Sequence, residues 1–86
     1  MNYKLAKQYS RKPWQLDLIK AGYKGRFDLG SLIEECGRDF VSLLYVEGSG
    51  TEIPGVKWEA WGDNKNYGFG ISPEESVAEL WLKLNY

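Results

Sequence analysis

The chain has 86 residues, of which 43% are hydrophobic and 27% charged, so it can build one small domain and has no room for a second core. It has no histidine and one cysteine, Cys36, which removes the usual general base, the commonest metal ligand and any internal disulfide. We therefore expect no enzyme, no metal and no cofactor. The lone thiol and the lack of an apolar leader favour a cytoplasmic protein.

The net charge of −1 hides an uneven distribution of charge along the chain. Residues 1–26 hold seven basic residues and one acidic residue, whereas the rest of the chain holds four basic and eleven acidic residues. We expect a single domain of residues 1–86, in which residues 1–12 form a basic arm. Two interpretations of the arm stay open: it contacts nucleic-acid phosphates, or it lies against the acidic body of the same chain.

Residues 12–22, KPWQLDLIKAG, are predicted to form the first helix. Pro13 suits the first helical position, where its missing N–H costs nothing, and Gly22 suits the stop position. Two sets of apolar side chains are candidates for the inward face: Trp14, Leu18 and Ala21, or Leu16 and Ile19.

Residues 28–37, DLGSLIEECG, are predicted to form a second helix that ends at Gly37. Asp28 can cap its start, or Ser31 with Glu34 can form a capping box one turn later. Apolar residues recur at helical spacing and should face the core. They are Leu29, Leu32, Ile33 and Cys36. On this stripe Cys36 is expected to act as a small buried hydrophobe.

Three strands are predicted to follow. Residues 39–48, DFVSLLYVEG, are rich in β-branched and aromatic residues, and their continuous apolar run is typical of a central strand covered on both faces. Residues 56–62, VKWEAWG, alternate, which places Trp58 and Trp61 on opposite faces. The turn residues DNKN lead into YGFGI, residues 67–71, where Gly68 and Gly70 indicate a close neighbour or a bulge.

Residues 72–86, SPEESVAELWLKLNY, carry the clearest helix signals. Ser72 is an N-cap, Pro73 occupies the first position, and Glu75 completes a capping box. An apolar stripe of Val77, Leu80, Trp81 and Leu84 makes Trp81 a core residue. The element order α-α-β-β-β-α predicts an α+β fold: a three-stranded antiparallel meander packed by two or three helices, with both faces of the sheet partly covered.

The blocks LGSLIEECG, KWEAWG and GISPEESVAELWLKLN, in this order, resemble a large group of short, uncharacterised bacterial and phage or prophage proteins. That group carries an LSELIEACG-like helix, a strand with a W-x-A core and a closing G-x-(S/T)-P-E-E-A-V-A-x-L-W-L-x-L-N. The matching residues are Leu29, Ser31, Leu32, Ile33, Glu34, Cys36, Gly37, Trp58, Ala60, Ser72, Pro73, Glu74, Glu75, Val77, Ala78, Leu80, Trp81, Leu82, Leu84 and Asn85. The resemblance implies a compact domain similar to the α-β-α sandwich domains of phage proteins, and no activity. Residues 1–19 depart most from the pattern.

Two surfaces are candidate sites. Trp61, with Tyr67 and Phe69 across the hairpin, either packs in the core or forms an aromatic patch of the kind enriched in protein interfaces.

The leading hypothesis is a protein that binds another protein, such as an inhibitor or modulator of host machinery, as a monomer or weak homodimer without a membrane partner. The alternative is an accessory nucleic-acid binder. Its basic residues would be Lys4, Lys7, Arg11, Lys12 and Lys20. A third hypothesis is a carbohydrate or small-ligand binder that uses Trp61 and Tyr67, and a fourth is a structural domain that binds no ligand.

Overall fold

The structure is a computed structural model, and it describes residues 12–46 and 55–85. Three helices and three strands follow one another in the predicted order α-α-β-β-β-α, so the fold is α+β. The helices are α2 (Pro13–Lys20), α3 (Leu29–Cys36) and α4 (Pro73–Leu84). The strands are β1 (Phe40–Tyr45), β2 (Trp58–Gly62) and β3 (Tyr67–Gly70), and short 3-10 turns, Gly37–Asp39 and Asp63–Lys65, precede β1 and β3.

The strands form an antiparallel sheet in the order β1-β2-β3. Leu43, Ala60 and Gly68 lie side by side across it. The prediction that DNKN forms the turn between β2 and β3 is confirmed, because Asn64 and Lys65 adopt positive φ angles of 58° and 62° there.

The prediction that the first strand is a central strand covered on both faces is wrong. β2 is the central strand and β1 is an edge, on which Val41 and Leu44 are 59% and 46% exposed. A continuous apolar run indicates burial only when both neighbouring positions in the sheet are occupied, and in a meander the first strand has one neighbour.

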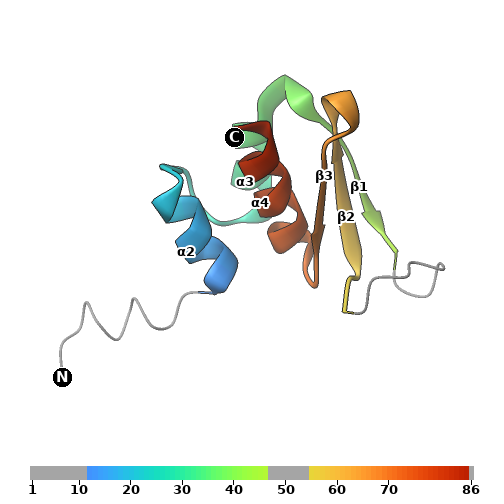
Figure 1. Cartoon of the computed structure of the whole chain (residues 1–86), viewed down its shortest axis with the longest axis horizontal. Helices are drawn as coiled ribbons and strands as arrows, with labels where there is room; N and C mark the ends of the chain where they lie inside the picture. The colour runs from blue at the N-terminus through green and yellow to red at the C-terminus, as the bar shows by residue number, and fades with distance from the viewer. Residues whose placement is uncertain (1–11, 47–54, 86) are drawn as a thin grey trace.

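Among the described residues, the helices all lie on one side of the sheet (Figure 1). α4 runs directly along β3 and β2, α3 packs beside α4, and α2 contacts α4. The expectation that both faces of the sheet are partly covered by helices is therefore wrong for the part of the chain that the structure describes. The continuous apolar run in β1 had suggested that helices cover both faces. Several of these apolar side chains are instead exposed, because β1 is an edge strand.

Glycine in β3 allows α4 to approach the sheet closely. A Cβ atom at Gly68 would lie 2.0 Å from the Ser76 carbonyl oxygen, and one at Gly70 would lie 2.7 Å from the Ser76 amide nitrogen. The close approach predicted from these two glycines is confirmed. A strand irregularity also exists, but it lies in β1, where the register shifts between Phe40 and Ser42.

The core lies between the sheet and the helices. Leu18, Leu32, Val77 and Leu80 are fully buried there. The first of the two predicted inward sets of α2 is the correct one, because Trp14 and Leu18 are buried, Ala21 packs against the core cluster and Ile19 is 44% exposed. The two other predicted stripes also face this core: Leu32 and Cys36 are buried on α3, and Trp81 is buried on α4.

Side-chain caps fix where α3 and α4 begin. Asp28 accepts the Ser31 amide at 3.1 Å, which confirms the first of the two predicted caps, and this bond lowers the pKa of the Asp28 carboxyl. At α4 the Ser72 hydroxyl accepts the Glu75 amide at 3.1 Å. The Glu75 carboxylate returns to the amide of Ile71, at 2.7 Å, one residue earlier than a standard capping box requires.

Cys36 occupies the predicted buried position. Its thiol lies 3.9 Å from the Val77 carbonyl oxygen in the core, and burial, with smaller contributions from Asp39 and Glu35, raises the pKa of the thiol to about 11. Because the thiolate is the reactive form, we expect no labelling of the native protein by a thiol reagent at pH 7 and full labelling in denaturant. Rapid labelling of the native protein would show that Cys36 is accessible and contradict this placement.

Candidate functional site

One face of the sheet points away from the helices, and we call it the open face. Alternation in each strand defines it, because Gly68 and Gly70 point at α4 and their neighbours in β3 therefore point the other way. The residues of β2 and β1 that pair with these β3 residues across the sheet complete the open face. The open face consists of Ser42, Leu44, Glu59, Trp61, Tyr67 and Phe69.

The three residues predicted as an aromatic patch meet on this face. Trp61 lies directly opposite Tyr67 in the β2–β3 pair, and their ring centroids are 4.3 Å apart at 84°, an edge-to-face contact. Tyr67 and Phe69 stack at 6.5 Å along the same side of β3. The sequence therefore located a continuous row of three rings, and the hairpin register brings them together.

Trp61 is neither a core residue nor freely exposed. Its side chain is half-buried on the open face, and its indole Nε1 is buried without a hydrogen-bond partner among the residues that the structure describes. A buried donor without an acceptor costs about 1–3 kcal/mol. This position therefore carries an unfavourable polar group, and the close ring contact with Tyr67 offsets it only in part.

The unpaired indole N–H leads to a prediction about Trp61→Phe. This substitution keeps an aromatic ring against Tyr67 and removes the N–H, so we expect the free energy of unfolding to change by less than about 1 kcal/mol, in either direction. Urea denaturation followed by circular dichroism measures the change. A loss as large as that of a buried tryptophan would mean that the indole ring fills a core position.

Charged groups border the aromatic row on both sides. Lys83 of α4 places its Nζ 5.4 Å from the centre of the Phe69 ring, and Glu59 lies opposite Phe69 in the β2–β3 pair. Neither residue was among the predicted site residues. The alternation of β2 places Glu59 on the Trp61 face, but Lys83 reaches Phe69 only through the packing of α4 along β3.

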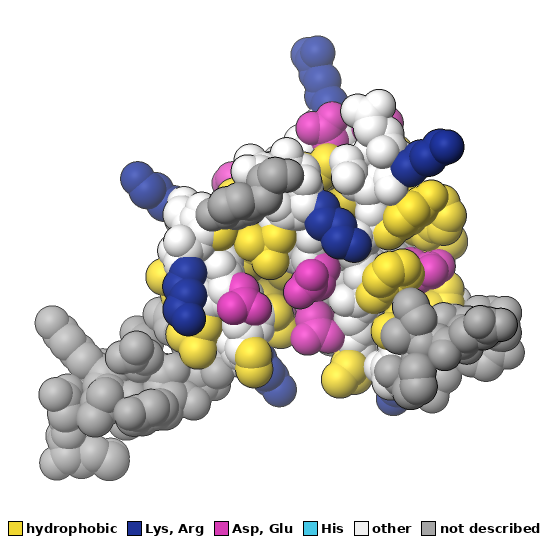
Figure 2. Space-filling view, in the orientation of Figure 1, with side chains coloured by type: hydrophobic (Ala, Val, Ile, Leu, Met, Phe, Trp, Pro, Cys, Tyr) yellow, Lys and Arg dark blue, Asp and Glu magenta, His cyan; other side chains and the backbone are white. Residues whose placement is uncertain are grey.

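Hydrophobic side chains gather beside the sheet on the surface of the molecule. Figure 2 shows a group of them along the right-hand side of the view, over the strands, and smaller groups at the lower left and centre, with charged side chains scattered between them. Val41 and Tyr45 of the edge strand are also exposed, at 59% and 57%, and Tyr45, which pairs with Trp58, lies on the helix side of the sheet. Large contiguous apolar patches rimmed by polar residues are one signature of interaction surfaces.

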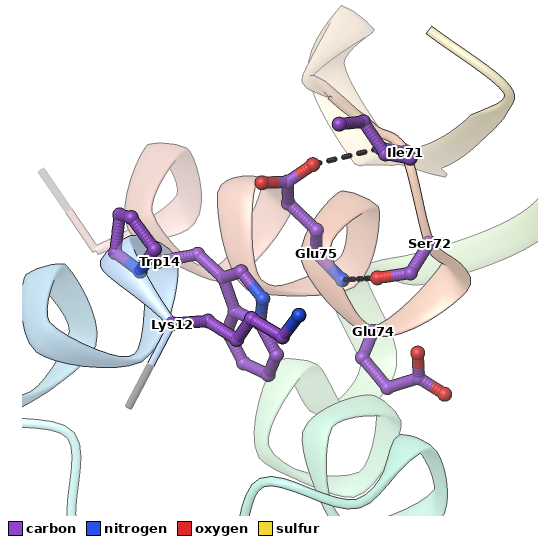
Figure 3. A pocket seen from close by; sticks show the side chains of 7 residues that line it. Lys12, Trp14, Ile71, Ser72, Glu74 and Glu75 are labelled. Atoms are coloured by element: carbon purple, nitrogen blue, oxygen red, sulfur yellow. Dashed lines mark hydrogen bonds between the residues drawn. The ribbon is translucent and has the colours of Figure 1, made fainter. Parts of the chain in front are cut away.

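A pocket of about 440 Å³ lies between the starts of α2 and α4. Figure 3 shows the Glu75 carboxylate turned toward the Ile71 amide and the Glu74 side chain pointing away from Trp14. No pattern in the sequence indicated this pocket, because helices far apart in the chain form it. Its lining residues are Lys12, Pro13, Trp14, Ile71, Ser72, Glu74 and Glu75. Within the described residues Lys12 forms no ion pair with either glutamate.

The predicted nucleic-acid residues do not gather in the described part of the chain. Lys12 and Lys20 are exposed before and at the end of α2. Lys4, Lys7 and Arg11 lie outside the described residues, so the two interpretations of the basic arm stay predictions. The salt bridge between Arg26 and Asp28, at 3.5 Å, is fully on the surface and contributes little.

The other shifted titratable groups belong to the core or to its margin. Burial, with smaller contributions from Glu35 and Asp28, raises the pKa of Tyr23 to about 12, and its hydroxyl donates to the Arg26 carbonyl. Partial burial also raises the pKa of Glu79 on α4.

Among residues 12–46 and 55–85, no three His, Cys, Asp or Glu side chains are grouped as metal ligands. No helix in these ranges has the length and apolar character to cross a membrane.

The chain was compared with protein-family models, with curated proteins and with solved structures. No family model, no curated protein and no solved structure matches it.

Proposed function

We propose that this chain acts by binding another protein through the open face of its sheet. The observation that carries the proposal is the row of Trp61, Tyr67 and Phe69, three contacting rings on a face that no described helix covers. Aromatic side chains supply large contact areas at low entropic cost, and tryptophan and tyrosine are enriched among the residues that dominate binding energy.

The chemistry around the rings favours a protein partner over a sugar. Leu44 of the same face and Val41 of the adjoining edge are apolar and exposed, so a ligand that covers the face must bury aliphatic surface beside the rings. Lys83 and Glu59 at the margin of the row offer one charge of each sign, as in the polar rim of a protein interface. The resemblance to phage and prophage proteins makes a host protein, inhibited or modulated by this chain, the partner that we propose.

The proposal is tested by capture from a bacterial lysate on the immobilised full chain, followed by purification of the captured protein. Trp61→Ala is expected to weaken the measured affinity by about thirtyfold, as for a central interface tryptophan worth about 2 kcal/mol. Ile71→Ala is the matched control, because Ile71 is 63% exposed, follows the end of β3 and lines the pocket between α2 and α4 rather than the open face. It should bind as the wild type does.

Folding must be separated from binding in this experiment. Both variants are therefore checked by circular dichroism and thermal unfolding before the titration. If a folded Trp61→Ala variant binds the captured protein as tightly as the wild type, the open face is not the binding surface and the proposal is wrong.

A further inference from the structure

The pocket between the starts of α2 and α4 is separate from the open face. It lies among the helices, on the other side of the sheet (Figure 1). Pro13, Trp14 and Ile71 form apolar walls, and a lysine and two glutamates lie among them. A concave site of about 440 Å³ with apolar walls and a few polar groups has the size and character of a ligand site.

Trp14 turns a polar group into this pocket. The residue is only 8% exposed, yet its indole N–H donates no hydrogen bond to any atom of residues 12–46 or 55–85. Figure 3 shows the indole nitrogen on the side of the ring that faces the start of α4. Unlike the Nε1 atom of Trp61, this nitrogen is not fully enclosed, so a ligand in the pocket can reach it. Because an indole N–H only donates, a fitting ligand should present an acceptor such as a carbonyl oxygen.

The charged groups of the pocket favour a cation at its other end. The Glu75 carboxylate accepts the Ile71 amide at 2.7 Å, whereas the Glu74 carboxylate has no ion pair and accepts no hydrogen bond within the described residues. Lys12 sets one positive charge against these two negative charges, which leaves an excess of one negative charge. Figure 3 shows the Glu74 side chain turned away from Trp14, so the acceptor and the cation of one ligand must be separated by a spacer.

We propose that this pocket binds a basic residue, lysine or arginine, of a peptide from another protein. The backbone carbonyl of that residue accepts the Trp14 indole N–H, and its cationic group pairs with the Glu74 carboxylate. Its aliphatic stem joins the two ends and lies along the apolar walls, because long basic side chains bury their stems on apolar surface. A simple amine lacks the carbonyl, an aliphatic residue lacks the cation, and an anion would be repelled by both glutamates.

This inference does not rest on the proposed function. The lining of the pocket and the open face have no residue in common, and they lie on opposite sides of the sheet. Either surface can therefore bind its ligand without the other, and the two proposals can fail separately.

Nuclear magnetic resonance of the full chain with N-acetyl-lysine methylamide tests the site. The chain has four tryptophans, and the loss of one indole N–H signal in Trp14→Phe identifies the signal of Trp14. Trp61→Phe identifies the signal of Trp61 in the same way. We expect the ligand to shift the Trp14 signal downfield, because a hydrogen bond forms there, and to leave the Trp61 signal in place. The dissociation constant should be in the millimolar range, as for other ligands of this size.

Two further ligands separate the two polar contacts. N-acetyl-norleucine methylamide keeps the carbonyl and the stem but has no cation, and pentylamine keeps the cation and the stem but has no carbonyl. Each is expected to bind about fivefold more weakly than the lysine ligand, the loss of one hydrogen bond or ion pair. Pentylamine should also leave the Trp14 signal without its downfield shift.

Glu74→Gln tests the carboxylate on the protein side. This variant should bind the lysine ligand about fivefold more weakly and the norleucine ligand as the wild type does. Glu34→Gln is the matched control, because Glu34 is exposed on α3 and does not line the pocket. It removes the same charge and should bind both ligands as the wild type does.

Two results would overturn the inference. One is a Trp14 signal that stays in place at tens of millimolar of the lysine ligand, which would mean that the indole N–H receives no acceptor. The other is equal binding of the lysine and norleucine ligands by the wild type, or unchanged binding of the lysine ligand by a folded Glu74→Gln variant. Either form of this second result would mean that the pocket does not select a cation.

Discussion

Gly68→Ala is expected to destabilise the domain by about 3 kcal/mol or more, the upper part of the range for overpacking. The added Cβ would lie 2.0 Å from the carbonyl oxygen of Ser76 and 2.4 Å from the amide nitrogen of Leu80. Both are backbone atoms of α4, so no side chain can rotate out of the way. The helix must move off the sheet, which opens the core around Leu80.

Urea denaturation followed by circular dichroism measures this loss, and Gly30→Ala is the matched control. Gly30 lies in α3, where an added Cβ would meet only Asp28 Oδ2, at an ordinary contact distance of 3.6 Å. Alanine also favours the helix over glycine by up to about 1 kcal/mol, so this variant should be as stable as the wild type or more so. Equal stabilities of the Gly68→Ala and Gly30→Ala variants would show that α4 does not pack this closely on β3.

Trp81→Ala is expected to cost about 3–5 kcal/mol, the range for removal of a large aromatic side chain from a core. Trp81 is buried on α4, and its ring meets Tyr23 edge-to-face at 5.1 Å. Tyr23 in turn stacks on Phe27 at 5.8 Å, so the loss of Trp81 also loosens the segment between α2 and α3.

Trp61→Ala is the informative comparison for this variant, because both changes remove the same atoms. Trp61 is half-buried, so its loss should cost about 1–2 kcal/mol, and the protein should remain folded. Thermal unfolding of the two variants under the same conditions gives the ranking. If Trp61→Ala proved the more destabilising, the assignment of Trp81 to the core and Trp61 to the surface would be reversed.

The sequence was sufficient to predict most local structure, because local chemistry determines it. Ser72 and Asp28 cap helices through contacts within one turn, and these caps placed the starts of α4 and α3 correctly. The two glycines of β3 were informative for a similar reason, since glycine at alternate strand positions leaves room on one face only.

The predictions that failed concern contacts between residues that are distant in sequence. The apolar run in β1 has the composition of a covered strand, but whether a strand lies at the centre or the edge is decided by pairing, which composition does not report. The row of rings was predictable in part, because the turn at Asp63–Lys65 fixes Trp61 opposite Tyr67. The approach of Lys83 to Phe69 and the pocket beside Trp14 depend on how the helices pack, so they were missed.

We propose that the open face, rather than the basic N-terminal part of the chain, carries the function. The most direct test titrates one purified binding partner with Trp61→Ala and with the double variant Lys12→Glu/Lys20→Glu, two exposed lysines outside the open face. We expect Trp61→Ala to lose affinity by about thirtyfold and the double variant to bind as the wild type does at moderate salt. Loss of binding in the double variant, with Trp61→Ala unaffected, would contradict it.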